Sequence, residues 1–275
     1  MLTSRTFTGA PTASSAEPPL DAMFVESVLR HDRRIVAGGL ATVTAVSWWW
    51  ILAMSVDMYG PMRGASAWAM TSAWDLPHLV LLFAMWAVMM MAMMLPSATP
   101  MLMLYIAVVR RSDQAAVARR TYALASGYLV VWVLFSAIAT GAQRVLSAQS
   151  IVSPMMVLTD VRLGGMLLLV VAAYQFTPLK RSCLDACRSP LSLITSYWRP
   201  GARGALTMGV RHGVYCLGCC WALMLLLFVG GVMNVWVIAG LTLFVFIEKV
   251  TPIGRLASYL GGAVLAVLGV WLLVR

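Results

Sequence analysis

One unbroken apolar run covers residues 213–247 and contains no charged side chain. A helix that crosses a bilayer core needs roughly 17 to 25 apolar residues, so this run is too long for a single span. We divide it at Gly230 and Gly231, because paired glycines permit a tight turn. The run therefore predicts two consecutive membrane spans.

The composition of the whole chain supports the same class of protein. Apolar residues make up 61% of the sequence and charged residues 11%, and the mean hydropathy is +0.85, which excludes an ordinary soluble domain. The net charge of +10 would favour a nucleic-acid partner in a soluble chain. In a membrane protein, basic residues collect in cytoplasmic loops, so we expect the lipid bilayer and no nucleic acid as partner.

We predict an all-α fold, a polytopic transmembrane bundle of about seven helices. Residues 1–34 are rich in Ser, Thr, Ala and Pro and predict a disordered cytoplasmic tail, and residues 35–275 form the integral membrane domain. No cleavable signal peptide is expected. The spans are expected near residues 35–56, 76–95, 121–143, 163–176, 205–229, 232–247 and 256–274.

The distribution of basic residues predicts the orientation. With a cytoplasmic N-terminus, fifteen of the 20 Lys and Arg residues fall in the inside segments and four in the outside segments. Arg211 is the remaining one and lies within the fifth span. This asymmetry follows the positive-inside rule, so we expect the N-terminus inside and the C-terminus outside.

The second span contains the sequence WAVMMMAMMLPS, residues 86–97, with five methionines in six consecutive positions. Methionine is a flexible filler of hydrophobic cores, and its thioether is also a soft ligand that selects Cu(I). Both uses stay open at this point. Residues 219–228, CCWALMLLLF, align Trp221 with Trp86 and Met224 with Met89. The match is either chance or an inverted repeat of three plus three spans after the first span, as in many transporters.

The fifth span carries the richest chemistry, in the sequence RHGVYCLGCCWALM. His212, Cys216, Cys220 and Met224 recur every four residues, and Cys219 lies one turn beyond Cys216. At helical spacing, an imidazole, three thiols and a thioether therefore share one broad face. This pattern favours a soft-metal site over three isolated buried cysteines.

Two further features lie on the predicted cytoplasmic side. Cys183 and Cys187 are four residues apart, which places both thiols on one helical face among basic residues. Metal capture or redox exchange fits them better than a structural disulfide, because cytoplasmic thiols stay reduced. Glu248 and Lys249 end the sixth span, where we expect a charge pair at the membrane interface. Glu248 is also a candidate proton relay.

Three blocks of the sequence carry a family resemblance: WAVMMMAMMLPS, YQFTPLKRSCLDACRSP and the segment from GVYCLGCCWALM to FVFIEK. They resemble the bacterial predicted metal-binding integral membrane proteins grouped as domain of unknown function 2182. The resemblance implies an integral protein of the bacterial inner membrane with a metal site, and it supplies no reaction. The matching ligands would be Met89, Met90, Met93, Met94, Cys183, Cys187, Cys216, Cys219 and Cys220.

Two functions remain open. The first is binding and transport or delivery of a soft metal, with copper as Cu(I) the expected ion and a metallochaperone or metalloenzyme as a candidate partner. The second is a membrane thiol oxidoreductase that uses the fifth-span cysteines, which ranks lower because no outside CxxC pair is present. Haem ligation by His212 and a methionine is a minor alternative. Hydrolytic motifs are missing, so an enzyme is the less favoured reading.

Overall fold

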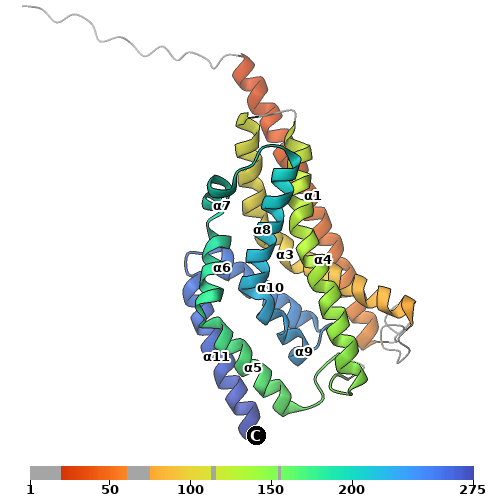
Figure 1. Ribbon diagram of the computed structural model, residues 1–275. Coiled ribbons are helices and arrows are strands. Elements are labelled where there is room, and N and C mark those ends of the chain that lie inside the picture. The colour runs from red at the N-terminus through yellow and green to blue at the C-terminus, as the bar shows by residue number, and fades with distance from the viewer. Residues whose placement is uncertain (1–19, 61–74, 113–115, 154–155) are drawn as a thin grey trace, which may run out of the picture.

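The computed structural model describes residues 20–60, 75–112, 116–153 and 156–275 (Figure 1). These ranges fold into helices joined by short connections, and they contain no strand beyond an isolated bridge between Val152 and Leu158. The predicted all-α fold is confirmed for this part of the chain.

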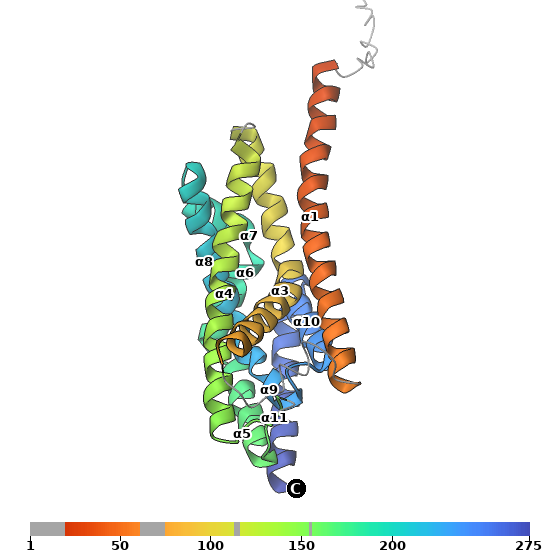
Figure 2. The ribbon, with the colours of Figure 1, turned by 90° about the vertical axis from the view of Figure 1, so that its right-hand side faces the viewer.

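The helices follow one another along the chain as an elongated bundle (Figures 1 and 2). They are α1 (Leu20–Tyr59), α3 (Leu76–Ser112), α4 (Val117–Ala148), α5 (Val161–Gln175), α6 (Pro178–Arg188), α7 (Pro190–Tyr197), α8 (Gly201–Met224), α9 (Leu226–Gly230), α10 (Val235–Val250) and α11 (Gly254–Val274). Helix α1 begins inside the predicted tail, and residues 1–19 of that tail lie outside the described residues.

Five helices of the described ranges are long and apolar enough to cross a membrane: α1, α3, α4, α11 and the α8–α9 segment. A sixth span is obtained if α5 and α6, which are bent by 62° at their junction, cross together. The predicted sixth span corresponds to α10, which has 16 residues. Seven spans therefore stay a prediction.

The expected turn at the paired glycines is confirmed. Gly231 ends α9 with a φ of 95°, a left-handed conformation that glycine adopts without a steric penalty. Asn234 then caps α10, because its side-chain oxygen accepts hydrogen bonds from the backbone N–H groups of Trp236 and Val237. The turn reverses the chain, so α10 returns toward α8.

Helix α3 does not stop at residue 95, where the predicted second span ended. It continues through Pro96 and Pro100, and Figure 2 shows that its two halves run in different directions. A proline inside a helix removes one backbone hydrogen bond and bends the helix. The hydroxyls of Ser97 and Thr99 donate to the carbonyls of Met94 and Leu95, which supplies partners for the carbonyls at the bend.

Helices α4 and α8 pack with their backbones in close approach. A side-chain Cβ at Gly209 would lie 2.0 Å from the carbonyl oxygen of Leu124, and one at Gly127 would lie 2.2 Å from that of Leu206. Small residues that let helix backbones meet in this way are common between membrane helices. The glycines therefore fix the distance between the two helices that carry Tyr128 and the cysteines.

A buried hydrogen bond joins α3 to α4. The indole Nε1–H of Trp86 donates to Gln143 Oε1 over 2.7 Å, and both side chains are almost completely buried. A buried indole N–H usually has such a partner, because an unpaired donor in an apolar environment costs free energy. The contact fixes the N-terminal half of α3 against the bundle.

Replacing Gln143 by leucine is expected to lower the free energy of unfolding by about 1 kcal/mol, since the Trp86 N–H is left without an acceptor. Unfolding of the purified protein in detergent measures the change. In a Trp86→Phe background the donor is gone, so the same substitution is expected to cost less. An equal cost in both backgrounds would contradict the assignment of the effect to this hydrogen bond.

Candidate metal centre

The cysteines of α8 lie on its buried face, as their spacing predicted. Cys216, Cys219 and Cys220 are 0–2% exposed, and His212 is 6% exposed on the same face. Trp221 lies away from this face and is 36% exposed. The helical period alone therefore places three thiols and an imidazole inside the bundle.

Lys249 of α10 reaches into the cysteines. Its Nζ donates a hydrogen bond to Cys216 Sγ over 2.9 Å, and it lies 3.9 Å from Met94 Sδ and 4.0 Å from Cys220 Sγ. Ser97 Oγ accepts from the same nitrogen at 3.4 Å. The expected charge pair of Glu248 and Lys249 is wrong, because Glu248 pairs with Lys180 and Lys249 contacts Cys216.

Glu248 forms a different ion pair. Both of its carboxylate oxygens accept from Lys180 Nζ, at 2.8 and 2.9 Å, and both side chains are at most 1% exposed. The neighbouring Arg188 donates to the backbone carbonyls of Glu248, Thr251 and Pro252. These carbonyls lie at or just after the C-terminal end of α10, where intrahelical donors run out, and that of Thr251 also accepts from the backbone N–H of Gly254. Arg188 and Lys180, both from α6, thus hold the end of α10 in the interior.

Tyr128 of α4 closes one side of the cluster. Its hydroxyl is 3.1 Å from Cys216 Sγ and 3.2 Å from the carbonyl oxygen of Met94. The ring of His212 stacks on it with a centroid distance of 5.4 Å. His212 Nδ1 is buried, and no hydrogen-bond partner for it is found among the described residues. The imidazole therefore lies one aromatic ring away from the cysteines.

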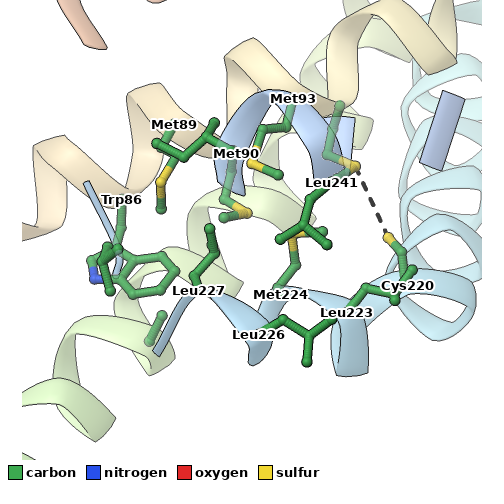
Figure 3. Close-up of a cluster of buried hydrophobic side chains, with 14 of the residues drawn as sticks. Trp86, Met89, Met90, Met93, Cys220, Leu223, Met224, Leu226, Leu227 and Leu241 are labelled. Carbon is green, nitrogen blue, oxygen red and sulfur yellow. Dashed lines mark hydrogen bonds between the residues drawn. The ribbon is translucent and has the colours of Figure 1, made fainter. Parts of the chain in front are cut away.

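The methionines of α3 fall into two groups. Met94 is in the polar cluster, because its Sδ is 3.9 Å from Cys220 Sγ. Figure 3 shows Met89, Met90 and Met93 with their sulfurs among leucines and near Met224 of α8, in the apolar core. Whether these four sulfurs bind metal stays a prediction.

Helix α6 brings Cys183 and Cys187 against the same core. Both side chains are partly exposed, and both pack against the hydrophobic core that contains Cys216 and Cys219. A Cβ added at Gly218 would lie 2.6 Å from Cys183 Sγ, so this glycine leaves the room that the thiol of Cys183 occupies. Five thiols from two helices are therefore neighbours.

The thiols do not converge on one point in the described residues, where no three His, Cys, Asp or Glu side chains are placed to hold a metal together. Cys219 and Cys220 instead donate to the backbone carbonyl of Cys216, at 3.1 and 2.9 Å. A thiol four residues after a carbonyl finds this partner whenever no better ligand is present. Each thiol loses the hydrogen of this bond when it binds a metal as a thiolate.

Sequence reasoning gave Tyr128 no role, and it named Lys249 only in a charge pair and Lys180 and Arg188 only as basic neighbours of Cys183 and Cys187. Lys249 and Lys180 give a usable signal, since a basic side chain near an apolar run marks a functional site when it is not at the interface. Arg188 directly follows the candidate ligand Cys187, whereas Tyr128 lies near no other candidate ligand in the sequence. Tertiary packing brings Lys249 and Tyr128 to Cys216, and Lys180 and Arg188 to the end of α10.

Comparison with known families adds a second observation. The family described as "PpoB2: Copper chaperone" matches residues 83–272 of the 275. The chain belongs to this family. No curated protein and no solved structure matches the chain.

The PpoB2 match agrees with the metal-binding character that the sequence resemblance implied, while the designation as domain of unknown function 2182 stays a prediction. The matched region starts in α3 and ends in α11. It includes every residue of the sulfur cluster, from Met94 to Lys249, and leaves out α1. The copper-related family and the cluster of soft ligands therefore occupy the same part of the chain.

Proposed function

We propose that the protein binds one Cu(I) ion through Cys216, Cys220 and Met94 and delivers it to a partner at the membrane. The observation that carries this proposal is the 3.9 Å separation between Cys220 Sγ and Met94 Sδ, which joins α8 to α3. Cu(I) is the substrate, and a metallochaperone or a metalloenzyme is the class of partner. The family match to copper chaperones supports the choice of metal.

The separation of the two sulfurs suits a shared metal. With metal–sulfur bonds of about 2.3 Å, the length that zinc thiolates have, two sulfurs at 120° around one ion lie about 4.0 Å apart. The observed distance is 3.9 Å. Cys216 Sγ provides the third ligand, since Lys249 Nζ contacts it together with both other sulfurs. Thiolates and thioethers are the ligands that Cu(I) prefers.

The remaining candidates take secondary roles in this proposal. Cys219 and Cys187 are neighbouring thiols to which the ion can transfer, and partly exposed Cys183 continues the series toward the surface of α6. Met89, Met90, Met93 and Met224 line the adjoining core with thioethers. His212 and the proton relay at Glu248 stay predictions.

Thiol–disulfide exchange is the weaker alternative. A thiolate must contact the sulfur of its partner in order to exchange a disulfide. Cys216, Cys219 and Cys220 are at most 2% exposed, so a partner protein has no direct access to them. A small ion that moves from ligand to ligand is subject to no such requirement.

We infer that the helical bundle is an integral protein of the bacterial inner membrane, with the N-terminus in the cytoplasm. Many large apolar side chains of α1 and α11 are exposed, among them Trp49, Val56, Val267 and Trp271. Such faces are suited to lipid, in which contiguous apolar surface carries no cost. The excess of basic residues on one side supports the orientation.

Metal analysis of the purified full-length protein under reducing conditions tests the function. We expect about one equivalent of bound copper after loading with Cu(I), retained against a weak chelator. Protein that takes up no Cu(I) under these conditions would sink the proposal.

Replacing Met94 by leucine is expected to weaken Cu(I) binding about tenfold or more, because leucine keeps the volume and removes the ligand sulfur. Competition with a chromophoric Cu(I) chelator gives the dissociation constant. Met90→Leu is the matched control, since Met90 is equally buried on the same helix but lies in the apolar core. If both variants bind like the wild type, the methionines serve packing alone.

A further inference from the structure

We propose that Lys249 determines the metal specificity of the sulfur cluster. Its ammonium group occupies one corner of the cluster, where it admits a monovalent ion with few ligands and opposes a divalent ion with four. This inference rests on the proposed function, in which Cys216, Cys220 and Met94 bind the metal.

The geometry places the ammonium nitrogen among the ligand sulfurs. Lys249 Nζ is 2.9 Å from Cys216 Sγ, 3.9 Å from Met94 Sδ and 4.0 Å from Cys220 Sγ. Ser97 Oγ, at 3.4 Å, is its oxygen neighbour. A side chain with three N–H donors and no lone pair can approach sulfurs in this way but cannot itself be a ligand. Lys249 therefore places a positive charge directly beside the three ligand sulfurs.

Among the described residues, no carboxylate forms an ion pair with Lys249. The adjacent carboxylate of Glu248 is held by Lys180 through two hydrogen bonds, at 2.8 and 2.9 Å. Lys249 is 8% exposed, so water does not solvate it freely. A buried ammonium requires compensating negative charge or hydrogen bonds, and the sulfur cluster provides them.

The position of Lys249 is also fixed. It lies in the last turn of α10, and Arg188 of α6 donates to the carbonyls of Glu248 and Thr251 at the end of that helix. The backbone that carries Lys249 is therefore attached to α6 and cannot move away without breaking these bonds. A metal that enters the cluster has to accept the ammonium as a neighbour.

Counting charges favours a monovalent metal. Cys216 and Cys220 each release a proton when they bind a metal. Two thiolates with one Cu(I) form a complex of charge −1, and the ammonium of Lys249 neutralises it. The same thiolates with a divalent ion form a neutral complex, which leaves the ammonium uncompensated beside a doubly charged ion. In a low-dielectric interior this repulsion is strong.

Counting ligands gives the same preference. Zn²⁺ is almost always bound by four ligands in a tetrahedron when its site is structural. The proposed ligand set has two thiols and one thioether, and the ammonium lies beside all three sulfurs. Soft ligands alone do not separate Cu(I) from Zn²⁺, because thiolate binds both. The ammonium of Lys249 supplies the discrimination between Cu(I) and Zn²⁺ that the soft ligands lack.

The test compares Lys249→Met with Lys249→Arg in the purified full-length protein under reducing conditions. Methionine removes the charge and offers a thioether, whereas arginine keeps the charge and is the matched control. We expect the preference for Cu(I) over Zn²⁺ to fall about tenfold or more in Lys249→Met and to stay near the wild-type value in Lys249→Arg. Chelator competition measures both affinities, and Co²⁺ reports thiolate ligation of a divalent ion by its absorption.

The outcomes separate the two proposals. Wild-type protein that binds neither Cu(I) nor Ag(I) overturns the proposed function. Wild-type protein that binds Cu(I), together with a Lys249→Met variant of unchanged preference, overturns the role of Lys249 and leaves the function standing. Lys249→Gln replaces the methionine variant if that one does not fold. Stoichiometric uptake of Zn²⁺ by the wild-type cluster also overturns the inference, without any variant.

Discussion

Replacing Cys216 by serine is expected to abolish Cu(I) binding while the bundle stays folded. Serine is nearly the same size and can still accept from Lys249 Nζ and hydrogen-bond with Tyr128, which are the contacts of this side chain. It offers a hard oxygen in place of a soft thiolate, so the affinity for Cu(I) should fall about 100-fold or more. Competition with a Cu(I) chelator measures the loss, and size-exclusion chromatography checks the fold.

Cys219→Ser is the matched control for this experiment. Cys219 lies on the same helix with the same burial, but its thiol donates to the Cys216 carbonyl and makes no contact with Lys249 or Met94 that the structure records. We expect its affinity for Cu(I) to stay within a few-fold of the wild-type value. Equal loss in both variants would reveal a site of three thiols and contradict the ligand set of Cys216, Cys220 and Met94.

Replacing Gly209 by alanine is expected to destabilise the bundle by about 3 kcal/mol or more, the upper range for overpacking a core. The new Cβ would lie 2.0 Å from the carbonyl oxygen of Leu124, and a backbone atom cannot move aside as a side chain does. The helices α4 and α8 would have to separate, and Tyr128 would move away from Cys216. Thermal unfolding in detergent and the yield of monodisperse protein measure the effect.

Gly141→Ala is the control, because a Cβ at this position of α4 meets nothing within 4 Å. Alanine has the higher helix propensity, so this variant should be as stable as the wild type or slightly more so. If Gly209→Ala is also as stable as the wild type, the close approach of the two helices is not required for folding.

Local sequence was sufficient for the parts of the fold that depend on local rules. The α8 thiols are buried together because a helix repeats every 3.6 residues, and the turn at Gly231 forms because glycine tolerates a φ of 95°. The end of the second span was wrong, since Pro96 bends α3 but does not end it. The hydroxyls of Ser97 and Thr99 add hydrogen bonds to the carbonyls of Met94 and Leu95 next to the proline, and a propensity rule does not include them.

The candidate site was harder to predict, because its selection depends on tertiary packing. Met89, Met90, Met93 and Met94 look alike in the sequence, and the bend of α3 and the approach of Cys220 single out Met94. The two aligned segments, residues 86–89 and 221–224, also lie in different environments. Trp86 is fully buried and the aligned Trp221 is 36% exposed, so the proposed repeat has no support from their surroundings.

Lys249 is a second residue whose environment depends on tertiary packing and not on local sequence. A lysine at the end of an apolar run is normally assigned to the membrane interface, where its charge meets water. In the structure Lys249 is instead 8% exposed and contacts Cys216, while Arg188 of α6 donates to the carbonyls at the C-terminal end of α10. The decisive partner is about 60 residues away in the chain, and no pattern around Lys249 points to it.

The spacing of the cluster along the chain sets the order in which its parts are completed during synthesis. Met94 and Lys249 are separated by 155 positions, and Cys220 lies between them. A ribosome releases α3 first, then α8, and α10 near the end, and domains assemble in that order. A chain that ends before α8 therefore has Met94 without its two cysteine partners, and a chain that ends before α10 has all three proposed ligands without Lys249. If the cluster binds Cu(I) as proposed, the first holds no copper firmly, and the second lacks the charge that opposes divalent ions.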